Sequence, residues 1–396
     1  MIIRTLTLFD RFKCSGAACK DTCCVRDRLV IDNKTYFEYQ RVIAKGDAFG
    51  RRMVASISGR NGVATFRLRE NGECPFLLRS HLCELHIRLG ADKVCETCRK
   101  YPAFEKEYGN HREIGFSFSC PEVLRLVLTH PEHFATRQRE NDTDPIIYDN
   151  LDAEMLQAIY PVRERFLEIA QDARNSLQMT LSVLLRLALR VQDAIDRREY
   201  GEFASIIAPF ENDPTGGMSR ETPDPILHDA LMQKLLKMHN KLEYRKQENA
   251  VRIVRAYRIF KSETPTERTE RERAFLALVH DRIYEYRKWL FYVLHRDLLD
   301  TVRDRQFCAH VCHAVVTTLC LFEYGSLEWK SRGKFPTDRQ EELFRNYSKE
   351  IEDNPRNYAR LQKKLTGSNF ATEKLVHVVS HPAEEGGPAV PFGEDL

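Results

Sequence analysis

The sequence predicts a mainly α-helical protein: a small cysteine-rich, loop-dominated metal-binding domain with a short β-hairpin, followed by a larger all-α domain. Two observations lead to this prediction. Nine of the twelve cysteines fall in the first third of the chain, and from about residue 151 apolar residues recur at three- and four-residue steps. We therefore expect a metal-binding domain over residues 1–125, a helical domain over 126–380, and a disordered tail over 381–396, which is rich in proline and glycine.

Short elements are predicted between the cysteines of the first domain. Residues 31–39 indicate a strand or turn that passes into a helix, with Asp32 and Asn33 as candidate caps. Residues 63–69 alternate apolar and polar side chains between two Asn-Gly pairs, which favours a short hairpin strand leading to the next cysteine. Residues 82–89 have helical spacing, and the glycine directly after them is the predicted end of that helix.

The second domain is predicted from long amphipathic stripes. The first stripe follows the N-cap signal Asn175-Ser176 and consists of Leu177, Leu181, Leu184, Ala188 and Val191. Similar stripes occur over residues 227–260, 274–299 and 308–322. Pro336-Thr337 followed by Gln340 predicts a capping box that opens a later helix. Breaks are expected at residues 139–150, 209–225 and 262–266.

Composition and charge exclude some classes of function. The 61 basic and 58 acidic residues leave a net charge of +3, so no overall field favours nucleic acid or an anionic membrane. Residues 1–13 carry charges instead of an apolar signal segment, and no run of about 18 uncharged apolar residues could span a membrane. We expect a cytoplasmic protein without a membrane span, in which reduced thiols bind metal instead of forming disulfides.

The early cysteines are the candidate metal ligands. Cys14, Cys19 and the adjacent pair Cys23-Cys24 form a C-x4-C-x3-CC motif with small residues in its first turn. Side chains of adjacent residues diverge, so Cys23-Cys24 favours one ligand to each of two centres, or one ligand and one supporting thiol. The remaining candidates are Cys74, Cys83, Cys95, Cys98 and Cys120. Four thiolates satisfy one zinc ion or cubane cluster and eight satisfy two, so the number of centres stays open.

Other metal-binding residue types have simpler interpretations. His81 and His86 flank Cys83 and could join a Cys/His zinc site, but an exposed or hydrogen-bonded histidine is the default. Cys308 and Cys312 would share one helical face among apolar neighbours. Buried small side chains explain that stripe better than a second metal site does.

Six short motifs follow one another through the cysteine-rich part. They are CSGAACKDTCC at residues 14–24, IDNKTYFEY from Ile31, CPFL at 74–77, LCELHIRLG at 82–90, TCRKYP at 97–102 and SCPE at 119–122. Together they resemble the flagellin lysine N-methylase family. The amino-terminal part is also similar to a broader group of zinc- or iron-chelating cysteine domains.

The resemblance implies a protein-lysine N-methyltransferase that contains a [4Fe-4S] cluster and transfers a methyl group from S-adenosylmethionine to lysines of flagellin or a flagellin-like protein. The sequence has neither a glycine-rich turn after a strand nor a C-x3-C-x2-C motif, so no usual donor site is readable. A cluster with three cysteine ligands would leave one iron able to chelate the donor, whereas four ligands would not. The lysine must also lose a proton, for which Glu84, Glu96 and Glu105 are the nearest carboxylates.

A second class of function stays open at this stage. The same cysteines could hold zinc or iron in a non-catalytic or redox module, with the helical domain binding a partner protein. Anaerobic iron and sulfide analysis, together with a methyl-transfer assay, distinguishes the two classes.

Overall fold

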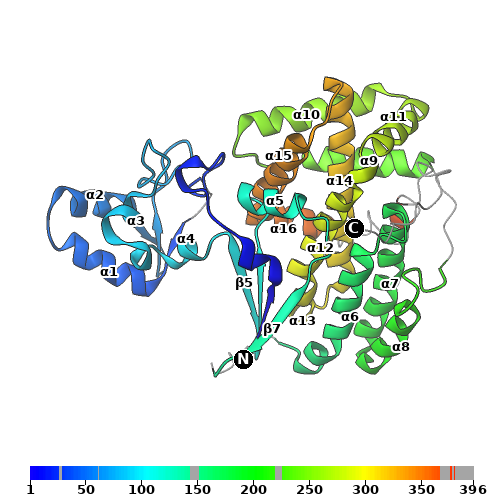
Figure 1. Cartoon of the computed structure of the whole chain (residues 1–396), viewed down its shortest axis with the longest axis horizontal. Helices are drawn as coiled ribbons and strands as arrows, with labels where there is room; N and C mark the ends of the chain where they lie inside the picture. Colours follow the sequence, from blue (N-terminus) through cyan, green and yellow to red (C-terminus); the bar gives the residue numbers. More distant parts are fainter. Residues whose placement is uncertain are drawn as a thin grey trace, which may run out of the picture.

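The computed structural model describes residues 1–25, 29–60, 62–142, 151–218, 225–365, 375–376 and 379. A small lobe that contains most of the candidate cysteines stands beside a larger body of long helices, and short strands lie between the two (Figure 1). The predicted mainly α-helical class, with a cysteine-rich amino-terminal part and a larger helical part, is confirmed. The predicted tail over 381–396 lies outside the described residues.

The lobe packs short helices against a three-stranded antiparallel sheet. Its elements are β2 (Val30–Ile31), α1 (Asn33–Ile43), α2 (Ala48–Ser56), β3 (Ile57–Arg60), β4 (Val63–Phe66), α3 (Glu84–Leu89) and α4 (Glu96–Lys100). The sheet has the order β2-β4-β3, and Ile57 lies opposite Phe66 in the β3–β4 hairpin. The hairpin that the alternating pattern predicted is therefore present.

Local sequence signals set the ends of these helices. Asp32 is the N-cap of α1, and its Oδ1 accepts a hydrogen bond from the Thr35 amide at 2.9 Å, as predicted. Asp47 caps α2 in the same way, at 2.7 Å from the Gly50 amide. Helix α3 ends at Gly90, whose φ of +88° is a conformation that favours glycine.

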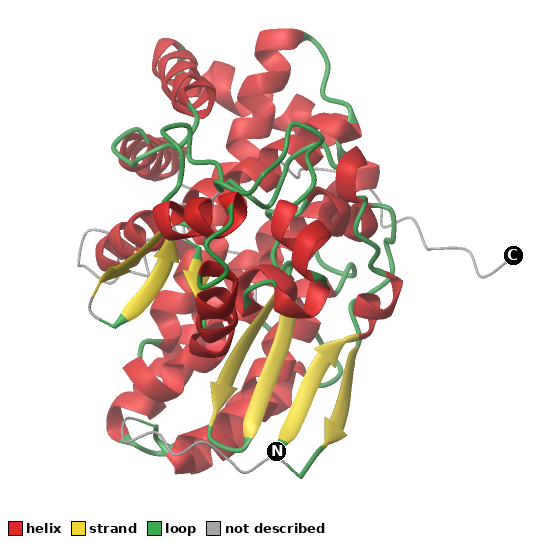
Figure 2. Cartoon of the chain, turned by 90° about the vertical axis from the view of Figure 1, so that its left-hand side faces the viewer, coloured by secondary structure: helices red, strands yellow, loops and turns green. Residues whose placement is uncertain are grey.

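A second sheet lies between the lobe and the helical body, and the sequence did not predict it. It consists of β1 (Ile2–Leu6), β5 (Ala103–Tyr108), β6 (His111–Phe116) and β7 (Thr136–Glu140), in the order β5-β6-β1-β7. β1 pairs in parallel with β6, and the other pairs are antiparallel. The N-terminus lies at one end of this sheet (Figure 2). Helix α5 (Pro121–Leu128) follows β6 and is largely buried.

The body is built from longer helices. They are α6 (Ala153–Gln171), α7 (Leu177–Arg197), α8 (Phe203–Ile207), α9 (Pro225–His239), α10 (Gln247–Ser262), α11 (Pro265–Leu278), α12 (Ile283–Asp297), α13 (Thr301–Asp304), α14 (Phe307–Arg332), α15 (Thr337–Tyr347) and α16 (Pro355–Leu365). Short 3-10 helices connect several elements, among them η1 (Thr7–Arg11) and η2 (Gly16–Ala18). A π-helical turn, η8 (Ser348–Glu352), separates α15 from α16.

The predicted stripes correspond to helices of the body. Ser176 caps α7, and its Oγ accepts a hydrogen bond from the Met179 amide at 3.1 Å. Residues 227–260 lie in two helices, α9 and α10, and residues 274–299 span α11 and α12. Part of each expected break at 139–150 and 209–225 lies outside the described residues.

The prediction of a capping box at the start of α15 is wrong. Pro336 is the N-cap, and no side chain caps the helix there. Gln340 is fully buried, and its Oε1 accepts a hydrogen bond from Tyr286 at 3.2 Å. The glutamine therefore faces the core instead of turning back to the cap. A capping box occurs at the start of α11 instead, between Thr264 and Glu267.

Helix α14 runs through the centre of the body. By length and composition alone it could cross a membrane, but 78% of its most apolar window is buried inside the fold. Cys312 and Cys320 of this helix are buried among apolar side chains. This agrees with the interpretation of the 308–322 stripe as core.

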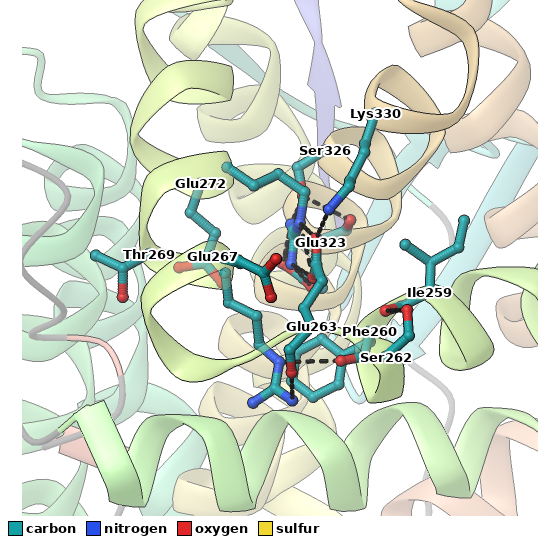
Figure 3. Close-up of polar contacts among 12 residues, drawn as sticks. Ile259, Phe260, Ser262, Glu263, Glu267, Thr269, Glu272, Glu323, Ser326 and Lys330 are labelled. Atoms are coloured by element: carbon teal, nitrogen blue, oxygen red, sulfur yellow. Dashed lines mark hydrogen bonds and ion pairs between the residues drawn. The ribbon is translucent and has the colours of Figure 1, made fainter.

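Charged residues buried in the body pair with one another. Arg271 of α11 lies 3.0 Å from Glu263 and 2.7 Å from Glu323, and it also donates to Ser326. Lys330 approaches Glu263 at 2.7 Å, and Figure 3 shows the Lys330 side chain pointing toward Glu263. The network ties α11 to α14, and removing one partner would leave an uncompensated buried charge.

The buried apolar side chains form two separate cores. One core lies in the lobe, and its buried residues run from Leu29 to Cys95. The other fills the body and also includes Leu6 of β1 and Phe116 of β6. The second sheet therefore packs with the body although most of its strands precede residue 125. The domain boundary at that residue stays a prediction.

Candidate metal centre

The structure divides the nine early cysteines into two groups. Cys74 and Cys95 are buried in the core of the lobe, and Cys24, Cys83 and Cys98 pack against that core. Cys23 is hydrogen-bonded to Cys24 and electrostatically coupled to Cys83, so it belongs with them. We name these six residues the lobe thiols. Cys120 instead belongs to the core of the body, and its electrostatic neighbours are Cys14 and Cys19; these three are the junction thiols.

Helix α4 brings two lobe thiols together. Cys95 is the N-cap of this helix, and the Cys98 amide donates to the Cys95 carbonyl at 2.9 Å. The Cys98 thiol hydrogen-bonds to Cys95, which lowers the pKa of Cys95 and raises the pKa of Cys98. Burial raises the pKa of Cys98 further. A lowered pKa of one thiol is typical of Cys-x-x-Cys motifs, and Cys95 and Cys98 have this spacing.

A backbone pairing brings the double cysteine to the same place. The Cys74 amide donates to the Cys24 carbonyl at 2.8 Å, and Val25 forms an isolated β-bridge with Glu73. A hydrogen bond with Cys23, followed by burial, raises the pKa of Cys24. Burial also raises the pKa of Cys74 to about 12. The charges of both Cys24 and Cys74 act on Cys98, so the two parts of the group are close enough to interact electrostatically.

The last lobe thiol lies at the start of α3. Cys83 forms a β-bridge with Leu77, which follows Cys74 in the CPFL motif. Burial raises the pKa of Cys83, while the amides of the first turn of α3 oppose that shift. A neutral thiol is therefore the stable form here, and a bound cation would reverse that preference by coordinating the thiolate.

A fully buried tyrosine faces the lobe thiols. Tyr39 of α1 is 0% exposed, and its hydroxyl has no hydrogen-bond partner among the residues that the structure describes. Burial, followed by the charges of Cys95 and Cys98, raises its pKa. Asp32 holds this arrangement, because its second carboxylate oxygen accepts a hydrogen bond from the Glu96 amide at 2.8 Å. The same side chain thus caps α1 and fixes the start of α4.

The junction thiols lie where the first loop meets the body. Cys120 is buried at the N-terminus of α5, and burial raises its pKa to about 11. Asp21, between Cys19 and the double cysteine, lies 3.0 Å from Lys349 and 3.3 Å from Arg345. These cations belong to η8 and α15, so the body holds the loop in place.

Oxygen-bearing side chains continue from the junction into the body. Ser119, next to Cys120, accepts from or donates to the Tyr101 hydroxyl at 3.1 Å and donates to Asp353 at 2.5 Å. Glu352, adjacent to Asp353, lies 3.0 Å from Arg296. Burial outweighs this pairing and raises the pKa of Glu352 to about 7. A carboxyl of this kind can take up or release a proton near neutral pH.

The donor set fits a sulfur-ligated metal centre in its chemistry. The lobe thiols are more than the four that one zinc ion or cubane cluster requires, and the unpartnered Tyr39 hydroxyl lies beside them. Among the described residues, no three histidine, cysteine or acidic side chains are already placed around a single metal position. The ligand set of nine cysteines stays a prediction.

The other residues predicted from the sequence, three glutamates as proton acceptors and two histidines as metal ligands, are less suited to those roles. Glu84 pairs with Arg52 and Arg88, and Lys100 neutralises both Glu96 and Glu105. These pairings leave the three glutamates poorly suited to accept a proton from a lysine. The remaining two candidates, His81 and His86, are exposed. Tyr39 and Asp32 were not proposed as site residues, although both lie within the IDNKTYFEY motif.

The fold and the thiol groups define a mainly helical protein with a thiol-rich lobe. The family model described as the FliB lysine N-methylase C-terminal domain matches residues 163–377, which is more than half of the chain. The chain belongs to this family, as the motifs of the first third predicted. The matched segment covers most of the helical body and leaves out the lobe.

Curated proteins with related sequences agree with this assignment. The chain is 26% identical to a lysine-N-methylase of Salmonella typhimurium over 225 residues, which is 53% of each protein. A lysine-N-methylase of Salmonella choleraesuis is 25% identical over 224 residues, again 53% of each. The flagellar biosynthetic protein FliU of Salmonella muenchen is 28% identical over 140 residues, 33% of this chain and 79% of FliU. The alignments to the two methylases thus span about half of their length. No solved structure matches the chain.

Proposed function

We propose that this chain is a cytoplasmic protein-lysine N-methyltransferase that acts on flagellin or a flagellin-like protein. S-adenosylmethionine is the methyl donor, and the lobe thiols hold a [4Fe-4S] cluster, with zinc as the alternative metal. The observation that carries the proposal is the gathering of six cysteines beside a helical body of the lysine N-methylase family. Membership of that family supports the reaction, and the thiols support the metal.

The reaction needs a place for the methyl donor and a group that accepts a proton. If three of the lobe thiols hold the cluster, one iron lacks a cysteine ligand and could chelate the amino and carboxyl groups of the donor. The substrate lysine must lose a proton, because its ammonium form has no lone pair. Burial raises the pKa of both Glu352 and Glu323 to about 7, so either carboxyl could hold or release a proton near neutral pH. Of these two we assign the proton to Glu352, because its neighbour Asp353 accepts a hydrogen bond from Ser119, next to Cys120.

An anaerobic assay tests the proposal directly. The protein is reconstituted with iron and sulfide, incubated with S-adenosylmethionine and unmodified flagellin, and the flagellin is analysed by mass spectrometry for methyl increments at lysine. We expect increments with the wild-type protein and with Cys308→Ser, a half-buried cysteine of α14 outside both thiol groups. Cys95→Ser should remove both the metal and the increments, because it deletes a buried lobe thiol.

The outcomes distinguish the proposal from its alternative. Metal uptake without any methyl increment, on a confirmed cognate flagellin, would favour a non-catalytic zinc- or iron-binding module with a partner-binding body. Increments that persist after complete metal removal would contradict a role of the lobe thiols in the reaction. EPR spectra with iron and sulfide analysis separate a cluster from a zinc site.

A further inference from the structure

The hydroxyl of Tyr39 is a buried donor without an acceptor. The side chain is 0% exposed within the core of the lobe, and its Oη has no hydrogen-bond partner among the described residues. The Cys95 amide lies near this oxygen but does not meet hydrogen-bond geometry. An amide could only donate to the oxygen, so the hydroxyl proton has no acceptor among the described residues. A buried hydroxyl in this state costs free energy of folding that a phenylalanine ring would not cost.

The surrounding structure holds the ring in this position. Tyr39 follows Thr35 by one helical turn on the buried face of α1. Asp32 fixes that face against the cysteine turn, since its two oxygens accept from the Thr35 amide at 2.9 Å and from the Glu96 amide at 2.8 Å. Helix α1 cannot rotate away from α4 without losing one of these bonds. These two bonds hold α1, with Tyr39 on its buried face, next to the turn that carries Cys95.

Cysteines share the core of the lobe with Tyr39, among them the buried Cys74 and Cys95. Cys95, Cys98 and Cys83 are the residues whose charges act on Tyr39. As thiols these groups are weak acceptors, but as metal-bound thiolates they carry negative charge and accept hydrogen bonds well. The missing acceptor is thus supplied when the lobe thiols bind metal.

We propose that Tyr39 is a positioning residue of the metal centre and donates a hydrogen bond to one of its sulfur ligands. The inference rests on the proposed metal centre and adds a residue to it that is not a ligand. A donor beside a sulfur ligand withdraws electron density from it, which stabilises the reduced form of an iron–sulfur cluster and raises its reduction potential. The same bond lowers the energy of the sulfur orbitals and changes the charge-transfer absorption of a cobalt-substituted site.

The experiment compares Tyr39→Phe with Tyr36→Phe. Tyr36 lies on the same helix and is only partly buried against the same core, so it controls for the loss of a hydroxyl from α1. Each full-length protein is reconstituted anaerobically with iron and sulfide, and its midpoint potential is measured by redox titration followed by EPR. A second preparation is loaded with Co²⁺ alone, and the thiolate-to-cobalt absorption band is recorded.

We expect Tyr39→Phe to bind the full amount of metal with a more negative midpoint potential and a shifted cobalt band, while Tyr36→Phe matches the wild type. Should Tyr39→Phe lose the metal, replacement of Tyr39 by 3-fluorotyrosine, a stronger donor of the same shape, is expected to move the potential in the positive direction. An unchanged midpoint potential and an unchanged cobalt band in a fully loaded Tyr39 variant would overturn the inference about Tyr39 and leave the proposed metal centre standing. A wild-type protein that takes up neither iron nor cobalt would overturn the proposed metal centre, and the inference with it.

Discussion

Glu352 is a single buried carboxyl whose ionisation depends on two opposing effects. Burial raises its pKa to about 7, and the ion pair with Arg296 opposes that shift. The Ser348 hydroxyl donates to the same carboxylate at 3.0 Å within η8. Single π-helical turns are frequent at functional sites. This one carries Glu352 next to Asp353, which accepts a hydrogen bond from Ser119, the neighbour of Cys120.

The raised pKa of Glu352 predicts a specific dependence of stability on pH. The folded-state pKa of about 7 lies above the unfolded value of 4.5, so the stabilisation is present below pH 4.5 and is lost as the pH rises to 7. Glu352→Gln removes this dependence. The difference in unfolding free energy, variant minus wild type, should therefore rise between pH 4.5 and 7, by up to roughly 1.4 kcal/mol per pH unit.

Urea denaturation at a series of pH values measures this difference. The control is Glu154→Gln, an exposed acid in the first turn of α6. Parallel curves for wild type and Glu352→Gln across this pH range would contradict the assignment of a raised pKa to Glu352. A rising difference for the control as well would point to a general charge effect instead.

At the scale of elements, Asp32 connects two helices that carry or orient the lobe thiols. It caps α1 through Thr35 and holds the amide of Glu96 at the start of α4. Asp47 performs only the first of these tasks, for α2, by accepting from Gly50. The two aspartates therefore form a natural pair for comparison.

Asp32→Ala should destabilise the lobe more than Asp47→Ala does. Loss of an N-cap costs about 1 kcal/mol, which is the full effect expected at Asp47. At Asp32 the Glu96 amide also loses its acceptor, which adds about 1 to 3 kcal/mol. Only the Asp32 variant should bind metal more weakly, because it frees the Cys95 turn. Chemical denaturation and a competitive chelator titration measure the two effects, and equal losses in both variants would refute the connecting role.

Sequence patterns predicted the elements unevenly, for physical reasons. The helical stripe from Leu177 and the cap at Ser176 were readable because they are local and periodic. The second sheet was not, because Ile2 pairs with His111 across most of the lobe and β7 is a fully exposed strand without alternation. Pairings between segments so distant leave no local signal in a single sequence.

The candidate site shows the same division. Nine early cysteines at short spacings predicted a metal site, which stays a prediction. Their separation into lobe and junction groups was not readable, because it depends on which core each one joins. Tyr39 had no distinguishing signal, since an aromatic residue on the apolar face of a helix is the ordinary pattern of a core. Only the unpartnered hydroxyl in the structure distinguishes it from an ordinary core residue.

At the scale of the whole molecule, the lobe is held to the body by polar contacts near the junction. Asp21 is the centre of these contacts, with Lys349, Arg345 and, at 3.8 Å, Lys246 around its carboxylate. Lys349 also approaches the Thr22 carbonyl at 3.4 Å. The two cores remain separate, so cooperativity between lobe and body must pass mainly through this junction and the second sheet.

Removal of the metal should therefore unfold the lobe and leave the body folded. The lobe core is small and includes two cysteines, Cys74 and Cys95, so a bound metal would supply much of its stability. The body has a large apolar core of its own around α7, α12 and α14. In hydrogen exchange read by mass spectrometry, chelation should accelerate exchange in α1 and α4 while α7 and α14 stay protected. If α1 and α4 remain protected from exchange after the metal is shown to be gone, the stability of the lobe does not depend on the metal. If α7 and α14 also lose protection, the junction couples the two cores more tightly than their separation indicates.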